Sequence, residues 1–192
     1  YIVNDTVSQD YVIREQSPPA GYIGTDDYYK ISLKEQIINI NTDSNSKTYP
    51  KQVKTTVQIT KCIQNGNSTT ETPVISWVID ITDSEDSSVR DIIITESGGT
   101  PAEIGKFRLS IDSATQKITN VSSIDSNGES TAIEIDNLNK ACTFALGDKS
   151  FYFDPDSLMV MPIAAESISF TNNYGLVFRK VDGSGAPLKG AD

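Results

Sequence analysis

The run Trp77–Glu96 reads WVIDITDSEDSSVRDIIITE, and it decides the class of fold. Both of its ends are rich in Ile, Val and Thr, which favour strands, and its middle is polar. In a strand, Ile92, Ile94 and Glu96 share one face, because side chains two residues apart point the same way. The acidic run Asp80–Asp86 does not have the spacing of a calcium loop and is better explained as a solvated loop. Two strands joined by a polar loop indicate an all-β protein.

The same pattern extends in both directions from this run. Short segments rich in Ile, Val, Thr, Tyr and Phe alternate with Ser, Asn, Asp and Gly, and Asn127-Gly128 is a hairpin turn signal. Strands with turn signals at short spacing suggest a β-sandwich. The expected strands are Tyr11–Glu15, Tyr28–Leu33, Gln36–Ile40, Val57–Cys62, Val74–Thr82, Asp91–Glu96, Phe107–Ile111, Ile118–Val121, Thr131–Ile135 and Ser167–Thr171.

The chain is expected to hold several β-domains in tandem. Residues 1–46 have too few strands for an independent domain and read as the end of one. A linker at 47–52 contains Pro50, which cannot donate to a ladder and marks an exposed connection. A long β-domain follows at 53–174, and residues 175–192 read as the first strand of another. The chain is therefore expected to cover one part of a longer array of domains.

Composition excludes several classes of function. The net charge of −10 and the pI near 4.4 argue against nucleic acid or an anionic membrane as a partner. No apolar run is long enough to span a bilayer. The chain has no His, so the usual zinc ligand and general base are missing. We therefore expect no metal, no cofactor and no enzyme acting on external substrates.

Two cysteines, Cys62 and Cys142, do not form a metal motif. Cys62 faces away from the side of its strand that carries Lys61. Cys142 is in phase with Phe144 and Leu146, which suggests that it faces the core. Because the facings differ, a disulfide between them is the less favoured alternative, although an oxidising compartment would permit it.

Three reactive residues continue apolar faces of the long domain. Lys61 is in phase with Val57 and Ile59, Glu96 with Ile92 and Ile94, and Asn172 with Ile168 and Phe170. Burial disfavours charge, so the Lys amine would become a free nucleophile and the Glu would stay protonated. The Glu could then polarise the Asn carboxamide, and attack by the amine would form an amide and release ammonia. The plainer alternative is a snorkelling Lys, a solvated Glu and an Asn that caps a turn.

A family resemblance favours the cross-link. The runs Trp77–Ile81 and Val89–Glu96 resemble the A-type, Ig-like domain of the collagen-adhesin family. The resemblance implies an internal isopeptide bond between Lys61 and Asn172, assisted by an acid at Glu96. The family more often has Asp at that position, and Asp91 and Asp80 are the alternative acids.

The flanking segments resemble B-type domains of the same family. The tail VFRKVDG at 177–183 resembles the opening of such a domain, which implies that Lys180 is a cross-linking amine. The run YVIREQSPPAGY at 11–22 resembles the E-box, which implies that Glu15 assists amide formation. Asn39 or Asn41 would then be the acceptor.

Tyr49-Pro50-Lys51 resembles the pilin motif of sortase-assembled pili in Gram-positive bacteria. The resemblance implies that a sortase joins Lys51 to the next subunit, and it places the protein in a cell-wall-anchored pilus. The expected partners are neighbouring pilin subunits, the sortase and a host surface or matrix ligand. The alternative is a surface adhesin that binds a host matrix ligand without polymerising.

Overall fold

The structure is a computed structural model, and it describes residues 2–39, 51–97, 100–164 and 173–174. These residues form strands and turns, and no helix occurs among them. The strands are β1 (Ile2–Arg14), β2 (Tyr22–Ile23), β3 (Tyr28–Asn39), β4 (Lys51–Asn65), β5 (Ser68–Asp83), β6 (Val89–Glu96), β7 (Ala102–Asp112), β8 (Lys117–Ile124), β9 (Ser130–Ala132), β10 (Cys142–Leu146), β11 (Lys149–Asp154), β12 (Met159–Pro162) and β13 (Asn173–Tyr174).

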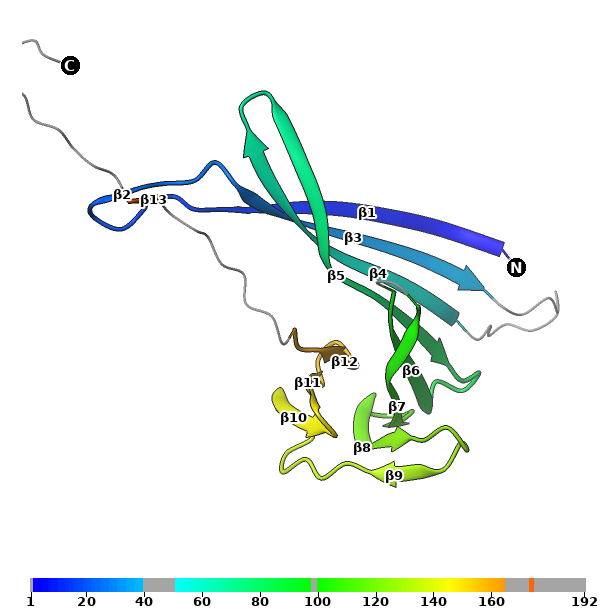
Figure 1. Ribbon diagram of the computed structural model, residues 1–192. Helices are drawn as coiled ribbons and strands as arrows, with labels where there is room; N and C mark the ends of the chain where they lie inside the picture. The colour runs from blue at the N-terminus through cyan, green and yellow to red at the C-terminus, as the bar shows by residue number, and fades with distance from the viewer. Residues whose placement is uncertain (1, 40–50, 98–99, 165–172, 175–192) are drawn as a thin grey trace, which may run out of the picture.

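Most strands belong to one antiparallel sheet in which the neighbours follow the chain order. This eight-stranded sheet has the order β1-β3-β4-β5-β6-β7-β8-β9 (Figure 1). A three-stranded sheet has the order β10-β11-β12, and β13 pairs with β2. Short turns close the hairpins, and Gly66 and Gly147 have the positive φ values (62° each) that the β4–β5 and β10–β11 turns require.

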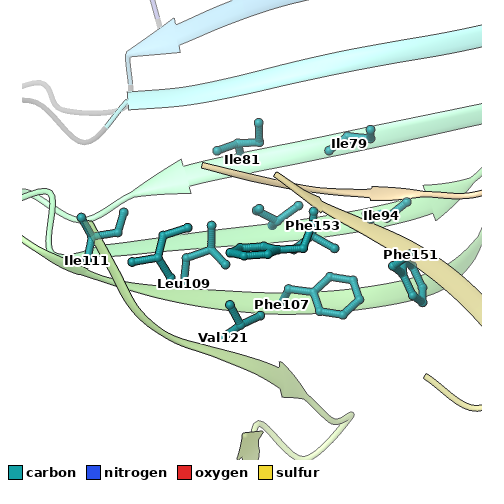
Figure 2. Close-up of a cluster of buried hydrophobic side chains, with 12 residues drawn as sticks. Ile79, Ile81, Ile94, Phe107, Leu109, Ile111, Val121, Phe151 and Phe153 are labelled. Carbon is teal, nitrogen blue, oxygen red and sulfur yellow. The ribbon is translucent and has the colours of Figure 1, made fainter. Parts of the chain in front are cut away.

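The core lies between the small sheet and the β5–β8 part of the large sheet (Figure 2). Alternate residues of β6 and β7 point inward, which gives the strict in-out burial that a half-covered strand shows. Phe107 meets Phe151 edge to face, with ring centroids 4.8 Å apart. The buried cluster contains Ile79, Ile81, Ile92, Ile94, Phe107, Leu109, Ile111, Ile118, Val121, Phe151, Phe153 and Val160. Two antiparallel sheets over one apolar core are consistent with a β-sandwich.

The large sheet continues past this core through β4 and β3 to β1. The ladder between β3 and β4 runs from Tyr28↔Cys62 to Asn39↔Lys51, so hydrogen bonding joins residues on the two sides of the predicted linker. The same sheet face that holds the core continues over β4 and β3 as an apolar surface, with rows such as Ile31↔Ile59 and Leu33↔Val57. The tandem-domain boundaries remain a prediction.

The all-β class is confirmed, and so are the positions of most expected strands. The segment Thr131–Ile135 was expected as a strand, but the strand there is short and ends at Ala132. The three strands of the small sheet were not expected. Only the shared phase of Cys142, Phe144 and Leu146 was predicted. The expected strand Ser167–Thr171 lies outside the described residues.

Candidate functional site

A cleft opens at the end of the core where β5 and β6 carry Trp77 and Glu96. The two residues are directly opposite each other in the ladder, and Glu96 is exposed. Backbone and side-chain bonds join the two strands beside them, with Ser76 Oγ and Ser97 Oγ 2.6 Å apart. The cleft has a volume of about 310 Å³, and its wall also contains Ile104, Asp148, Lys149, Ser150, Phe151, Pro162, Ile163 and Ala164. Nothing in the sequence indicated the part of this wall that comes from β11 and β12.

The alternation predicted for β6 is confirmed. Ile92 and Ile94 are fully buried, but Glu96, which continues their face beyond the rim of the core, is exposed, so the expected burial of its carboxyl is wrong. The bulge in this ladder falls on β7, because Ile94 pairs with Gly105 and Thr95 with Glu103. The phase of β6 is therefore unbroken up to Glu96.

Lys61 is a half-buried residue in an apolar part of β4. It lies between Ile59 and Ile63 on its own strand face and opposite Tyr29, which is only 5% exposed. The bulge between β4 and β5 falls on β5, at Val74, so the alternation of β4 reaches Lys61 unbroken. No carboxylate of the described chain lies within ion-pair distance of its Nζ.

The sheet register does not bring Lys61 and Glu96 together. Glu96 is opposite Trp77, and Trp77 is opposite Val57, which lies four residues before Lys61. Two strand spacings are about 10 Å, and four residues add about 14 Å along the strand. Asn172, the predicted partner of Lys61, lies outside the described residues, so the three-residue assembly stays a prediction.

Glu15 lies nearer to Lys61 in the register than Glu96 does. Ile13 is opposite Tyr29, which is opposite Lys61, and Glu15 follows two residues after Ile13. The offset is again about 10 Å across the sheet but only about 7 Å along it. The Glu15 carboxylate is folded inward: its Oε2 is buried and lies against Gly24, where an added Cβ would sit 3.4 Å from it.

At this end of the sheet, β2 pairs with β13, which directly follows Asn172 in the chain. Ile23 pairs with Asn173, and Tyr22 pairs with Tyr174. Ile23 directly precedes Gly24, the residue against the Glu15 carboxylate. The segment that packs against Glu15 therefore also pairs with the residue directly after Asn172. At the other candidate acid, Glu96, the cleft is bordered by Ala164, which lies eight residues before Asn172.

The two alternative acids already have cationic partners. Arg108 donates two hydrogen bonds of 2.8 Å from Nε and Nη2 to the two oxygens of Asp91, and this bond raises the pKa of Arg108. Asp80 Oδ1 lies 3.6 Å from Lys54 Nζ. Both are out of phase with the core residues of their strands, so neither shares the face of Lys61.

Both cysteines are free thiols, so the disulfide considered from the sequence is absent. Cys142 packs against the core beside Phe153, as its phase predicted. Cys62 is fully buried and opposite Tyr28. A hydrogen bond with Cys62 is the main reason that the pKa of Tyr28 is raised, while the Arg14 guanidinium lies 4.4 Å from the centre of the Tyr28 ring.

The remaining predicted site residues are placed only in part. Lys51 opens β4, and its backbone pairs with Asn39 at the end of β3. Asn41 and Lys180 lie outside the described residues.

Comparison with protein-family models, curated proteins and solved structures finds no match. Among the described residues, no group of three His, Cys, Asp or Glu side chains is arranged to hold a metal ion. The described part of the chain also contains no helix that is long and apolar enough to cross a membrane.

Proposed function

We propose that the chain is a structural segment of a covalently assembled cell-surface pilus, built from Ig-like β-domains. In this proposal Lys51 is the residue that a sortase joins to the next subunit. Lys61 and Asn172 form an intramolecular isopeptide bond, and the protein turns over no external substrate. This proposal is supported by the sequence resemblance, the all-β fold and the surroundings of Lys61.

The observation that carries the proposal is the position of Lys61. Lys61 is a half-buried residue between Ile59 and Ile63 and opposite the buried Tyr29, and no described carboxylate lies within ion-pair distance of its amine. An amide bond would give this amine a covalent partner in apolar surroundings that offer it no counter-charge. The neutral amine is also the form that attacks a carbonyl.

The reaction needs no co-reactant. The Lys61 Nζ forms a bond to Cγ of Asn172, the bond from Cγ to the side-chain nitrogen breaks, and that nitrogen leaves as ammonia. A neighbouring carboxylic acid donates to the Asn172 oxygen and carries the proton from the attacking nitrogen to the leaving one. Folding supplies the rate by holding the groups together.

Two carboxylates compete for the assisting role. Glu96 is the acid that the resemblance implies, and it borders the cleft beside Ala164, eight residues before Asn172. Glu15 has the buried oxygen and the shorter register offset from Lys61. Asp91 and Asp80 are poorer candidates because each is paired with a cation.

Intact mass spectrometry tests the cross-link. We expect the 192-residue chain to weigh one ammonia less than its sequence, and Lys61→Ala and Asn172→Ala to restore the full mass. Glu96→Gln and Glu15→Gln, made separately, identify the acid, because only the assisting one should restore it. Lys54→Ala, which removes another β4 lysine, should keep the deficit. A wild-type mass equal to that of the sequence would refute the cross-link.

Incubation with the pilus sortase and a sorting-signal peptide tests polymerisation. Wild-type chain should acquire the peptide at Lys51, and Lys51→Ala should not. If neither does, and the parent protein binds a matrix protein, the adhesin alternative replaces the pilus shaft.

A further inference from the structure

The chain contains the dipeptide Asn-Gly twice, and both copies lie at exposed turns. Asn65-Gly66 lies where β4 turns into β5, and Asn127-Gly128 lies between β8 and β9. This dipeptide is chemically reactive, because the main-chain nitrogen after an Asn can attack the side-chain carbonyl carbon, and glycine has no side chain to obstruct the attack. The two turns therefore hold the same reactive group in two different surroundings.

The Asn65-Gly66 peptide lies at the tip of a two-stranded ribbon that projects from the large sheet. β3 pairs with β4 only as far as Cys62, so beyond that residue β4 pairs with β5 alone (Figure 1). Residues 65–74 of this ribbon are all exposed. A two-stranded ribbon is marginally stable by itself, so the tip opens more readily than the strands over the core.

The amide nitrogen of Gly66 is free to react at this tip. Asn65 is opposite Ser68 in the ladder, which leaves Gly66 and Asn67 as a two-residue loop. Within the described part of the chain, no group accepts a hydrogen bond from Gly66 N, and no atom lies within 4 Å of an added Cβ at Gly66. Ser68 Oγ donates a hydrogen bond of 3.0 Å to the carbonyl oxygen of Asn65. This bond withdraws electrons from the same peptide group and makes its N–H more acidic.

The corresponding groups of Asn127-Gly128 are held in place by Asp125. Gly128 N donates a hydrogen bond of 3.0 Å to the carbonyl oxygen of Asp125, so its proton is lost less readily. The carboxylate of Asp125 accepts hydrogen bonds from Asn127 N at 2.9 Å and from Asn127 Nδ2 at 3.4 Å. A carboxylate at this position also disfavours the negative charge that develops when the Gly128 amide loses its proton.

We propose that Asn65 is a site of spontaneous deamidation, with water as the co-reactant, and that the turn at Asp125 protects Asn127. Gly66 N forms a bond to Cγ of Asn65, the bond from Cγ to Nδ2 breaks, and Nδ2 leaves as ammonia with the proton that Gly66 N gives up. The product is a cyclic imide. Water opens this ring at Cγ to give Asp, or at the main-chain carbonyl carbon to give isoaspartate. Either product adds one negative charge at the tip of the ribbon.

Peptide mapping by tandem mass spectrometry measures both sites in one sample of the 192-residue chain, stored in warm, mildly alkaline buffer. Asn65 should exchange ammonia for water roughly tenfold faster than Asn127, because one hydrogen bond and one nearby charge together account for a difference of that size. Asn65→Gln should abolish the product at this position, since the longer side chain forms the ring far more slowly. Asn67→Gln, at the neighbouring loop position, is the matched control and should leave the rate at Asn65 unchanged.

Two comparisons test whether the turns cause the difference in rate. In urea the two sites should react at similar rates, because both then present the same dipeptide without its turn. Asp125→Ala should accelerate the reaction of Asn127 severalfold and leave that of Asn65 unchanged. The proposal is overturned if the folded chain reacts at Asn127 as fast as at Asn65, if Asn65 stays intact, or if the same ratio of rates persists in urea. None of these results bears on the isopeptide bond, because that bond uses neither Asn-Gly pair.

Discussion

Asp86 organises the turn between β5 and β6 through a single carboxylate oxygen. Its Oδ1 accepts hydrogen bonds from Ser84 Oγ at 2.7 Å, Ser88 Oγ at 2.7 Å and Ser88 N at 3.0 Å. The Ser88 hydroxyl, then the Ser84 hydroxyl and the Ser88 amide, lower the pKa of Asp86 to about 2. These bonds favour the ionised form, since a protonated carboxyl accepts them poorly.

The titration of Asp86 can therefore be predicted. Because its folded-state pKa is lowered, its contribution to stability is present above the ordinary pKa of 3.8 and is lost as the pH falls through about 2. A carboxyl carbon NMR titration should give a midpoint near pH 2. Ser88→Ala should move that midpoint upward, and Ser68→Ala, at another exposed turn, should not. A wild-type midpoint near 4 would contradict the turn geometry.

Gly105 is a second residue whose identity the packing dictates. An added Cβ would lie 2.6 Å from Cε2 and 2.9 Å from Cζ of Phe107, and 3.1 Å from Phe151. Both rings are fully buried, so neither can move without disturbing the core.

Gly105→Ala should consequently lower the free energy of unfolding by about 1–3 kcal/mol, as overpacking does. Urea unfolding followed by Trp77 fluorescence measures it. Gly128→Asn is the control, because its positive φ suits Asn and no atom lies within 4 Å of an added Cβ. Equal stability of Gly105→Ala and the wild type would mean that the two rings pack differently.

At the scale of elements, Arg90 joins the two sheets of the core. From β6, its Nε and Nη2 donate to the carboxylate of Asp83 at 2.6 and 2.9 Å. Its Nη1 donates to the carbonyl oxygens of Ser157 (3.4 Å) and Leu158 (3.2 Å), just before β12. One planar guanidinium thus satisfies groups from both sheets, which a Lys ammonium cannot do with the same geometry.

Arg90→Lys should destabilise the protein by about 2 kcal/mol through these charged hydrogen bonds. Arg108→Lys is its matched control, because Arg108 forms a similar pair with Asp91 but within one sheet and with more exposure (43% against 20%). Its cost should stay below about 1 kcal/mol. Thermal unfolding of the two variants compares them directly, and equal effects would show that the link between the sheets contributes nothing.

The elements also show what sequence reasoning can reach. The strands of the large sheet alternate cleanly, as Ile92 and Ile94 do, and periodicity located them. The small sheet was not predicted because its strands are short and separated by turns that contain Gly147 and Pro155, although Phe151 and Phe153 alternate correctly. The facing of Lys61 and Glu96 was predictable from phase, but their distance was not, because register depends on bulges and turn lengths that no single strand encodes. The nearness of Glu15 to Lys61 in the register could not be inferred for the same reason.

At the scale of the whole molecule, the proposed bond between Lys61 and Asn172 would close most of the long domain into a covalent loop. By analogy with disulfides, such a loop stabilises by roughly 4–5 kcal/mol through the unfolded state. Lys61→Ala should lower the free energy of unfolding by that amount, whereas Lys34→Ala, at an exposed position of β3, should change it by less than about 0.5 kcal/mol. Denaturant titration compares the two, and a difference near zero would argue against the bond.

The chain-ordered arrangement of the large sheet has a kinetic consequence. From β4 to β9, every strand pairs with the one that precedes it in the chain, so none of these ladders waits for a distant segment. Local pairing keeps the entropy of loop closure small, and proteins with short-range contacts fold faster than β-proteins with crossed connections. During synthesis, a nascent chain of this design can form one hairpin at a time, in the order in which its residues leave the ribosome and before its last strands have been made.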